Sequence, residues 1–213
     1  VDIGRDDACT HVADRSEQLA KQRVRPIGAR DERGAPEFFT GGAKLQLLGG
    51  PNAKIRSEDL KAALAHRNPN FVHETPAAML SITNLTEFGT RYTAQEIAAL
   101  SELAKGHGLH VHLDGARFAN ALVGSGSTPA ELSWKSGVDI LSFGATKNGA
   151  LGCEAIILFG QARERYPELL ARAKRAGHMP AKMRYLSAQM CAYLENDLWL
   201  DLARQAVPVL VGG

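Results

Sequence analysis

The sequence predicts an α/β fold in which helices flank a mostly parallel sheet. Short apolar runs alternate with stretches of helical length from about residue 42 onward, which is the pattern of βαβ units. Glycines and helix-capping residues separate these runs and mark where each element ends. The 213 residues, of which 45% are hydrophobic and 23% are charged, suit one large domain of an ordinary globular protein.

Two strands and two helices are expected in the first half of this pattern. In chain order they are a strand at residues 43–50, a helix at 57–67, a strand at 77–83 and a helix at 93–108. The expected strand at 43–50, AKLQLLGG, ends in two glycines. The helix at 93–108 has the clearest limits, because Thr93 and Glu96 form a capping-box pattern and Gly108 provides a stop.

Three strands and several helices are expected in the second half. In chain order they are a strand at 109–114, a helical stretch, strands at 138–145 and 154–160, and helices from Gln161 onward. The last two strands are too close in sequence for a helix between them, so we expect them to pair antiparallel. Pro180 stands where a further helix can start, and Pro208 breaks the helical pattern near the end of the chain.

The composition argues against several classes of protein. A net charge of +2 gives no reason to expect a nucleic acid or an anionic membrane surface as a partner. No apolar run is long enough to span a bilayer, and the charged N-terminus does not resemble a secretory signal. Cys9, Cys153 and Cys191 lack the spacing of a metal site or a disulfide framework, which favours a cytoplasmic protein without a bound metal. A nucleotide-binding domain is disfavoured because neither common glycine-rich phosphate motif occurs.

Two of the expected strands end in residues that can carry chemistry. One strand ends at Asp114, with Arg117 three positions later. Another leads into Thr146 and Lys147. The carboxyl ends of parallel strands meet at one edge of a sheet, which is where ligands bind in open α/β folds. A lysine whose pKa is lowered by burial can form a Schiff base with an aldehyde. Lys147 and Asp114 are therefore a candidate pair for pyridoxal phosphate, which needs such a lysine and an acidic partner for its ring nitrogen.

Each of these residues also has a purely structural interpretation. Lys147 can be an ordinary surface lysine, and Asp114 can be the N-cap of the helix that follows. Arg117 can hold a substrate carboxylate in two hydrogen bonds or form a surface ion pair. Ser142 and Thr146 can donate to a cofactor phosphate, although hydroxyl groups beside loops are common. The residues alone leave these alternatives open.

Three longer motifs resemble low-specificity threonine aldolases, which belong to the β-eliminating lyase group of fold-type I pyridoxal-phosphate enzymes. The motifs are HLDGARFANAL at 112–122, DILSFGATKNGALGCEAIILF at 139–159 and KRAGHMPAKMRYLSAQMCAYLENDLWLDLA at 174–203. A fourth stretch, RGAPEFFTGGAKL at 33–45, is similar as well. The resemblance covers residues 31–204 and implies the large domain of a fold-type I enzyme, incomplete at both ends.

The resemblance implies a role for each matched residue. Lys147 would be the Schiff-base lysine, Asp114 would pair with the pyridine nitrogen, and Arg117 would bind the substrate carboxylate. Glu87, in TNLTEFGT, stands where many relatives carry a histidine near the substrate hydroxyl, and would act as the base directly or through a water. The implied reaction is the retro-aldol cleavage of β-hydroxy-α-amino acids such as threonine to glycine and an aldehyde. The resemblance also implies a small amino acid as substrate and a homo-oligomer, either a dimer or a tetramer.

Both ends of the chain depart from the resemblance. No Ser-Gly-Thr phosphate loop precedes the GAPEFF stretch, and RPIGARDERGAPEFF lacks the histidine that would stack on the cofactor ring. The relatives continue into a small C-terminal domain with a second arginine for the substrate carboxylate. We therefore expect atypical segments at 1–30 and 205–213 around a partial domain at 31–204, as a frameshift or a truncated reading frame would produce. The alternative function is a catalytically inactive fragment that at most associates with full-length subunits.

Overall fold

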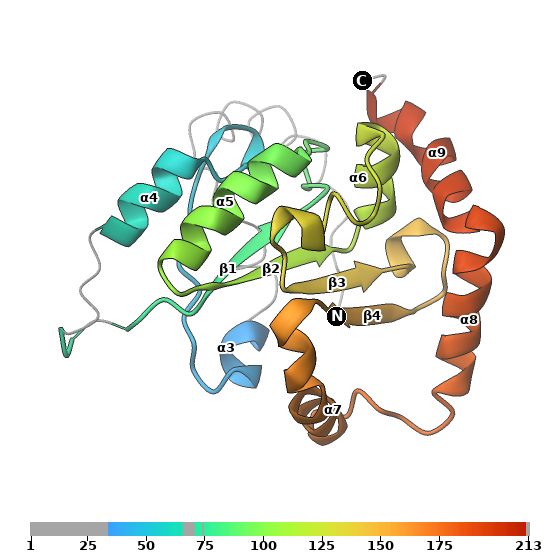
Figure 1. The fold of residues 1–213 in the computed structure, drawn as a ribbon. Helices are drawn as coiled ribbons and strands as arrows, with labels where there is room; N and C mark the ends of the chain where they lie inside the picture. The colour runs from blue at the N-terminus through green and yellow to red at the C-terminus, as the bar shows by residue number, and fades with distance from the viewer. Residues whose placement is uncertain (1–33, 66–70, 74, 212–213) are drawn as a thin grey trace, which may run out of the picture.

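A four-stranded sheet forms the centre of the fold (Figure 1). The computed structural model describes residues 34–65, 71–73 and 75–211, so the predicted segment at 1–30 lies outside it. β1, β2 and β3 are parallel, whereas β4 runs antiparallel to β3. This arrangement confirms both the mostly parallel sheet and the antiparallel last pair. The strands, in their order across the sheet, are β1 (Met79–Thr83), β2 (His110–Gly115), β3 (Ile140–Gly144) and β4 (Glu154–Leu158).

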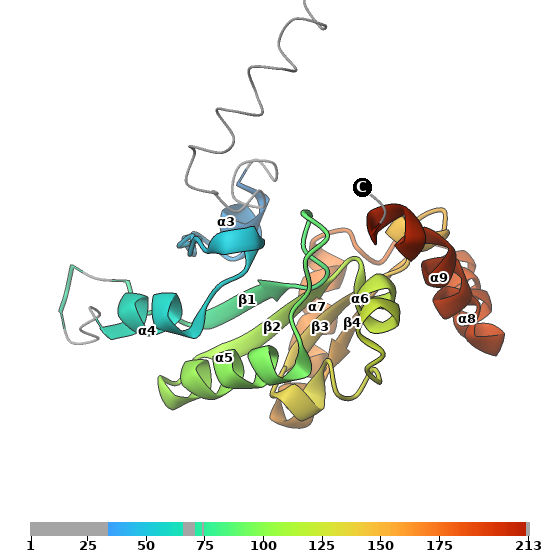
Figure 2. The same cartoon turned by 90° about the horizontal axis from the view of Figure 1, so that it is seen from above.

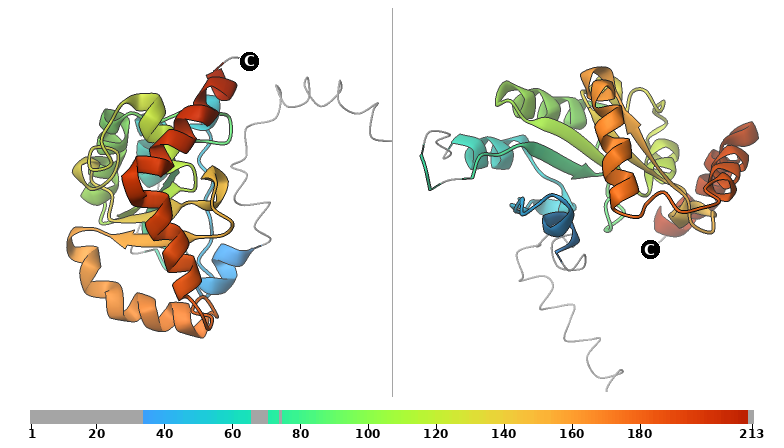
Figure 3. Two further views of the ribbon diagram at one scale, coloured as in Figure 1. Left: turned by 90° about the vertical axis from the view of Figure 1, so that its right-hand side faces the viewer. Right: turned by 90° about the horizontal axis from the view of Figure 1, so that it is seen from below.

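Helices connect the strands and continue the chain beyond β4. The α-helices are α3 (Ala35–Phe39), α4 (Ser57–Ala65), α5 (Ala94–Gly106), α6 (Phe118–Ser125), α7 (Tyr166–Arg175), α8 (Arg184–Leu194) and α9 (Leu198–Val211). The short 3-10 turns are η1 (Pro51–Ala53), η2 (Trp134–Ser136), η3 (Thr146–Asn148), η4 (Gly160–Arg165) and η5 (Glu195–Asp197). Helices α5 and α6 lie along one side of the sheet, and α8 and α9 follow one another at one end of it (Figures 2 and 3). No described helix is long and apolar enough to cross a membrane.

The hydrophobic core lies between the sheet and the helices on that side. Successive side chains of a strand face opposite sides of a sheet, so alternate residues of each strand enter the core. The core-facing strand residues are Leu80, Ile82, Val111, Leu113, Leu141 and Phe143. The helices contribute Ile97, Leu100 and Ala104 from α5, and Phe118 and Leu122 from α6. The opposite face of β1, β2 and β3 carries polar side chains, among them Asp114.

Helix α5 has the limits that its sequence predicts. The Thr93 hydroxyl accepts a hydrogen bond from the Glu96 N–H at 3.2 Å, and the Thr93 N–H donates to the Glu96 carboxylate at 2.8 Å. These two bonds satisfy N–H groups that the first turn of a helix leaves without intrahelical partners. At the other end, Gly108 has a φ of 75°, a left-handed conformation that glycine adopts easily. The capping box and the glycine stop are both confirmed.

Residues 43–50 do not form the predicted strand. They run as an irregular segment toward η1 and pair with none of the described strands, which leaves β1 at the edge of the sheet. An apolar run forms a strand only where a neighbouring strand exchanges backbone hydrogen bonds with it. The prediction was wrong because the pattern of apolar residues does not show whether such a neighbour is present.

Two predictions that rested on prolines were also wrong. Helix α8 begins at Arg184 rather than near Pro180. Lys182, between these positions, has a φ of 69°, which is incompatible with a right-handed helix. Helix α9 continues through Pro208 to Val211. A proline removes one helical hydrogen bond and kinks a helix, but the hydrogen bonds on either side can carry the helix past it.

Candidate active site

Asp114 lies at the carboxyl end of β2, half-buried on the polar face of the sheet. It is in register with Thr83 of β1 and Ser142 of β3. One carboxylate oxygen accepts from the Ala116 N–H at 3.0 Å, and the other accepts a long bond of 3.5 Å from the Thr83 hydroxyl. Asp114 is not the N-cap of α6, because Arg117 holds that position without a side-chain cap. The carboxylate is therefore fixed in direction and retains capacity to accept a bond from a ligand.

Lys147 lies in η3, directly after β3 and at the same end of the sheet as Asp114. Its side chain is exposed although it follows a buried strand, so burial does not act on this amine. The strand ends at Gly144, and η3 then turns the chain so that Thr146 and Lys147 face outward. The amine is accordingly accessible to a small molecule.

Two glycines let the ends of β2 and β3 approach each other closely. A Cβ atom on Gly144 would lie 2.7 Å from the Ala116 Cα, and one on Gly115 would lie 2.8 Å from the Ser142 carbonyl oxygen. Backbone atoms packed this tightly cannot yield without moving the strands, so a larger residue at either position would separate them. The glycines of the DGAR and FGAT stretches thus bring the two strand ends together.

Asn148 is the buried residue of η3, with 7% of its surface exposed. Its side-chain NH2 group donates to the Tyr193 hydroxyl at 2.6 Å and to the Trp199 carbonyl at 2.8 Å. Tyr193 belongs to α8 and Trp199 to α9, so one amide ties the turn after β3 to both C-terminal helices. The sequence does not predict this role for Asn148, because an asparagine before a glycine is also typical of an exposed turn.

Arg117 and Glu87 lie next to each other beside the end of β2. The Arg117 guanidinium is 4.0 Å from the Glu87 carboxylate, and the two side chains are 29% and 40% exposed. A partly exposed ion pair of this length adds little to stability. The fold therefore brings together two residues that are 30 positions apart in sequence, and both remain accessible to a ligand.

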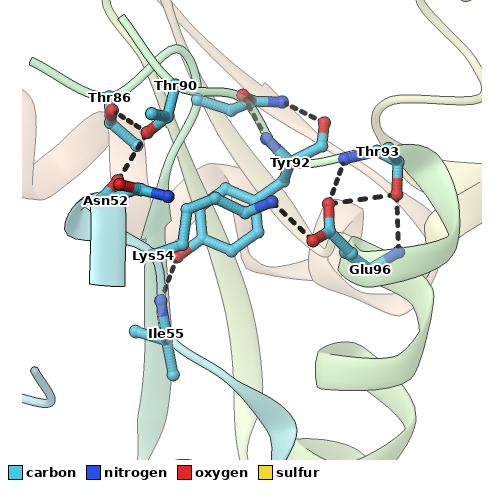
Figure 4. A network of polar contacts seen from close by, with 9 residues as sticks. Asn52, Lys54, Ile55, Thr86, Thr90, Tyr92, Thr93 and Glu96 are labelled. Atoms are coloured by element: carbon cyan, nitrogen blue, oxygen red, sulfur yellow. Dashed lines mark hydrogen bonds and ion pairs between the residues drawn. The ribbon is translucent and has the colours of Figure 1, made fainter. Parts of the chain in front are cut away.

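A network of polar contacts holds the loop that carries Glu87 (Figure 4). The hydroxyls of Thr86 and Thr90 share a hydrogen bond of 2.6 Å, and Thr90 also bonds to the Asn52 carbonyl at 2.5 Å. The Thr86 N–H donates to the Thr90 carbonyl at 2.9 Å. Glu87 is thus presented on a loop whose two sides are bonded to each other and to η1.

Tyr92 anchors the same loop at its base (Figure 4). Its hydroxyl accepts from the Ile55 N–H at 2.5 Å, and burial raises the pKa of Tyr92 to about 12, so this hydroxyl stays protonated. Its backbone N–H donates to the Asn84 side-chain oxygen at 3.1 Å, and the Asn84 NH2 group donates to its carbonyl at 3.2 Å. Because Asn84 is fully buried, these two bonds are shielded from water and hold the two sides of the loop together at its base.

The hydroxyls of Ser142 and Thr146 already have partners within the protein. Ser142 shares a hydrogen bond of 2.9 Å with His112 Nε2, and His112 Nδ1 shares one of 2.8 Å with Ser81. Burial lowers the pKa of His112. The Thr146 hydroxyl accepts from the Cys153 N–H at 3.1 Å, which leaves its own proton available to a ligand. His112 thus connects side chains of β1, β2 and β3. The sequence does not predict these contacts, because they depend on the register in which the strands pair.

Comparison with known proteins agrees with this geometry. The sequence profile of the beta-eliminating lyases matches residues 9–206. The chain belongs to the beta-eliminating lyase family. This assignment confirms the resemblance drawn from the motifs. The match begins within the segment at residues 1–30, and the division of the chain at residue 31 stays a prediction.

Curated relatives of this beta-eliminating lyase include two low-specificity L-threonine aldolases. The protein from Pseudomonas aeruginosa is 42% identical over 176 residues, which is 83% of this chain and 50% of that protein. The protein from a Pseudomonas species is 41% identical over 176 residues, with the same shares. The chain thus spans about half the length of the curated relatives it matches.

Solved structures give the same picture of the fold. The threonine aldolase of Leishmania major superposes with a TM-score of 0.72 at 31% identity, covering 83% of this chain and 50% of that one. A structure described as a putative L-allo-threonine aldolase from Listeria monocytogenes has a TM-score of 0.61 at 17% identity, covering 90% and 50%. The second likeness shows the fold alone. The sheet and its helices are therefore the large-domain architecture of fold-type I enzymes, present here in part.

Beta-eliminating lyases generally depend on pyridoxal phosphate. The chemistry of the side chains in this chain fits that cofactor, because an exposed primary amine and a half-buried carboxylate lie at neighbouring strand ends. The Thr146 hydroxyl, which donates to none of the described residues, adds a donor beside the lysine. Within the described ranges, no group of three or more His, Cys, Asp or Glu side chains lies close enough together to hold a metal ion.

Proposed function

We propose that this chain is a pyridoxal-phosphate-dependent lyase that cleaves β-hydroxy-α-amino acids of the threonine type to glycine and an aldehyde. The observation that carries the proposal is that Asp114, Arg117 and Lys147 all follow or end β2 and β3 at the same end of the sheet. A carboxylate, a guanidinium and an amine are groups that such a reaction requires. The threonine aldolases among the relatives support the substrate class.

In this proposal Lys147 holds the cofactor covalently through its amine, and Asp114 accepts a hydrogen bond from the pyridine nitrogen. Asp114 suits this role because its two existing bonds fix the carboxylate without using all of its acceptor capacity. The Thr146 and Ser142 hydroxyls are the proposed donors to the phosphate. When bound, pyridoxal phosphate supplies an electron sink for the charge left at Cα when the Cα–Cβ bond breaks.

Arg117 and Glu87 are the proposed contacts to the substrate. Arg117 binds the carboxylate, and Glu87 takes the proton of the β-hydroxyl directly or through a water as the aldehyde leaves. The 4.0 Å between the two side chains allows them to act on two ends of one small amino acid. Anchoring the carboxylate also fixes the direction of the breaking bond, which is how orientation lowers a barrier.

A direct test follows threonine cleavage by the purified chain with added pyridoxal phosphate. We expect glycine and acetaldehyde in equal amounts, with activity abolished in Lys147→Ala. In Arg117→Lys we expect a rise in KM, since a lysine cannot bind a carboxylate in two parallel hydrogen bonds. Lys174→Ala is the matched control, because Lys174 is an exposed lysine on α7 and its removal should change nothing.

The second candidate function is an inactive fragment that associates with full-length subunits. The observation that favours it is the share of 50% of the relatives' length that this chain covers. Leu151, in the turn after Lys147, is 93% exposed, and Ile156 on β4 is 54% exposed, so apolar surface is available for such a contact. Light scattering of this chain mixed with a full-length relative separates the two candidates. An inactive fragment would form a mixed oligomer and would cleave no threonine.

The main proposal includes a homo-oligomer in the cytoplasm. The free thiols of Cys153 and Cys191 suit that compartment.

A further inference from the structure

We propose that Asn148 is the positioning residue that sets the direction of the Lys147 amine. It does so by pinning the lysine turn, defined as residues 145–153, to the joint between α8 and α9. This inference rests on the proposed function, in which Lys147 is the reacting amine. It adds a residue that does not touch the substrate and acts only through its neighbour in the chain.

The lysine turn is closed at its two ends but has little regular structure between them. The Ala145 N–H donates to the Cys153 carbonyl, and the Cys153 N–H donates to the Thr146 hydroxyl, both at 3.1 Å. The only helical part of the turn is the three-residue η3, and no side chain caps it. The Asn148 and Ala150 N–H groups donate to the Ala145 carbonyl at 3.0 and 3.2 Å. The Lys147 amine forms no hydrogen bond or ion pair with any residue in the described part of the chain. The direction of Lys147 therefore depends on whatever holds the backbone of η3.

Asn148 is the side chain of η3 that ties this backbone to the C-terminal helices, whereas the Thr146 hydroxyl bonds only within the turn. Asn148 follows Lys147 directly, and it is the single buried residue of η3. Its NH2 group fills both donor positions, one to the Tyr193 hydroxyl and one to the Trp199 carbonyl. A buried amide that satisfies both donors in this way resists displacement, because each lost bond leaves a polar group without a partner.

The two acceptors are themselves held by aromatic packing. The rings of Tyr193 and Trp199 lie 6.4 Å apart between centroids, and both pack on Phe143, at 6.2 and 5.6 Å. Phe143 is the last residue of β3 before Gly144, so the cluster that places the acceptors stands on the strand that leads to the lysine. Burial also raises the pKa of Tyr193, which keeps its hydroxyl protonated.

Weaker contacts line the rest of the lysine turn. A Cβ atom on Gly149 would lie 3.0 Å from Leu202 of α9, and the Leu151 N–H donates to the exposed Gln189 side chain at 3.0 Å. These contacts begin after η3 and so do not fix the lysine itself. Within η3 itself, the Asn148 side chain makes the hydrogen bonds to both C-terminal helices.

The test compares Asn148→Asp, Tyr193→Phe and the unchanged chain. Aspartate keeps the size of the side chain but has no NH2 group to donate, whereas phenylalanine removes one acceptor and leaves the bond to Trp199. The first readout is amide hydrogen exchange in the lysine turn, without cofactor. We expect exchange about tenfold faster in Asn148→Asp and a smaller increase in Tyr193→Phe, since buried hydrogen bonds set local opening. Ile97→Val, a core change in α5 away from the turn, controls for a general loss of stability.

The second readout is reductive trapping by pyridoxal phosphate and borohydride, in which the amine condenses with the aldehyde, water leaves and hydride reduces the imine. Peptide mapping gives the yield at Lys147 relative to the other lysines of the same sample. We expect this ratio to fall about tenfold in Asn148→Asp at equal folded fraction, as misplacement of a reacting group does. A merely structural role for Asn148 would not change a ratio measured within one folded sample.

Each outcome decides the inference. Equal exchange in the turn, or an equal Lys147 ratio, in Asn148→Asp and the unchanged chain would overturn it. Absence of trapping at Lys147 in the unchanged chain would instead contradict the proposed function. In that case faster exchange in Asn148→Asp would still support Asn148 as the anchor of the lysine turn, and unchanged exchange would overturn that as well.

Discussion

Gly144 leaves no room for a side chain between the ends of β2 and β3. Its replacement by alanine would place a Cβ atom 2.7 Å from the Ala116 Cα, which is backbone and cannot rotate away. We expect Gly144→Ala to lower the free energy of unfolding by about 1–3 kcal/mol, the usual cost of overpacking. Urea denaturation measures this. Gly152→Ala is the matched control, because a Cβ there meets nothing within 4 Å, and an equal loss in both variants would contradict the account.

His112 makes stability depend on pH. Burial lowers its pKa below the ordinary value of 6.5, and the charge of Asp114 opposes part of that shift. At a pH between the lowered pKa of His112 in the folded chain and its ordinary pKa of 6.5, this side chain binds more protons in the unfolded chain than in the folded one. The free energy of unfolding therefore rises with pH across this window and falls as the pH drops below about 6.5. We expect His112→Gln to lose less stability than the unchanged chain between about pH 7.5 and 5.5. Parallel stability curves for the two proteins, from urea unfolding at each pH, would rule this out.

Some single residues of the candidate site could be predicted from the sequence, and others could not. Lys147, Asp114 and Arg117 were predicted because reactive residue types follow apolar strands in a specific order. Their positions at one edge agree with that prediction, while their chemical roles remain proposals. Asn148 and His112 were missed because their importance lies in contacts to residues far along the chain or on other strands. Periodicity and spacing carry no information on such contacts.

Helix α5 is the element whose stability is easiest to test. Its first turn depends on the Thr93 hydroxyl, which accepts from the Glu96 N–H. We expect Thr93→Ala to lower the free energy of unfolding by about 0.5–2 kcal/mol, as the loss of an N-cap does. Thr93→Ser keeps the acceptor and serves as the control in the same urea titration. If serine and alanine cost the same, the hydroxyl does not cap the helix.

The elements that were predicted correctly are those whose own sequence determines them. The four strands were found because their apolar runs are short and bounded by glycines or capping residues, and α5 because both of its ends carry signals. The strand predicted at residues 43–50 was wrong because a strand also needs a neighbouring strand. The helix start predicted near Pro180 was wrong because Lys182 adopts a left-handed conformation. Both failures concern backbone partners and conformations that side-chain patterns do not encode.

At the scale of the whole molecule, the candidate site depends on the C-terminal helices as much as on the sheet. The carboxyl ends of β2 and β3 point toward α8 and α9 (Figure 1), and Asn148 hydrogen-bonds to both of these helices. The chain covers 50% of the length of its curated relatives. A titration with pyridoxal phosphate tests whether these residues bind the cofactor.

That titration is the most direct test of the claim that Lys147 and Asp114 form one site for pyridoxal phosphate. The cofactor is added to the purified chain, and the absorbance band of its Schiff base with lysine is recorded. We predict a saturable band for the unchanged chain and for Lys174→Ala, no band for Lys147→Ala, and weaker binding for Asp114→Asn, which loses the charge opposite the ring nitrogen. No band at saturating cofactor, or the same band in Lys147→Ala, would contradict the account.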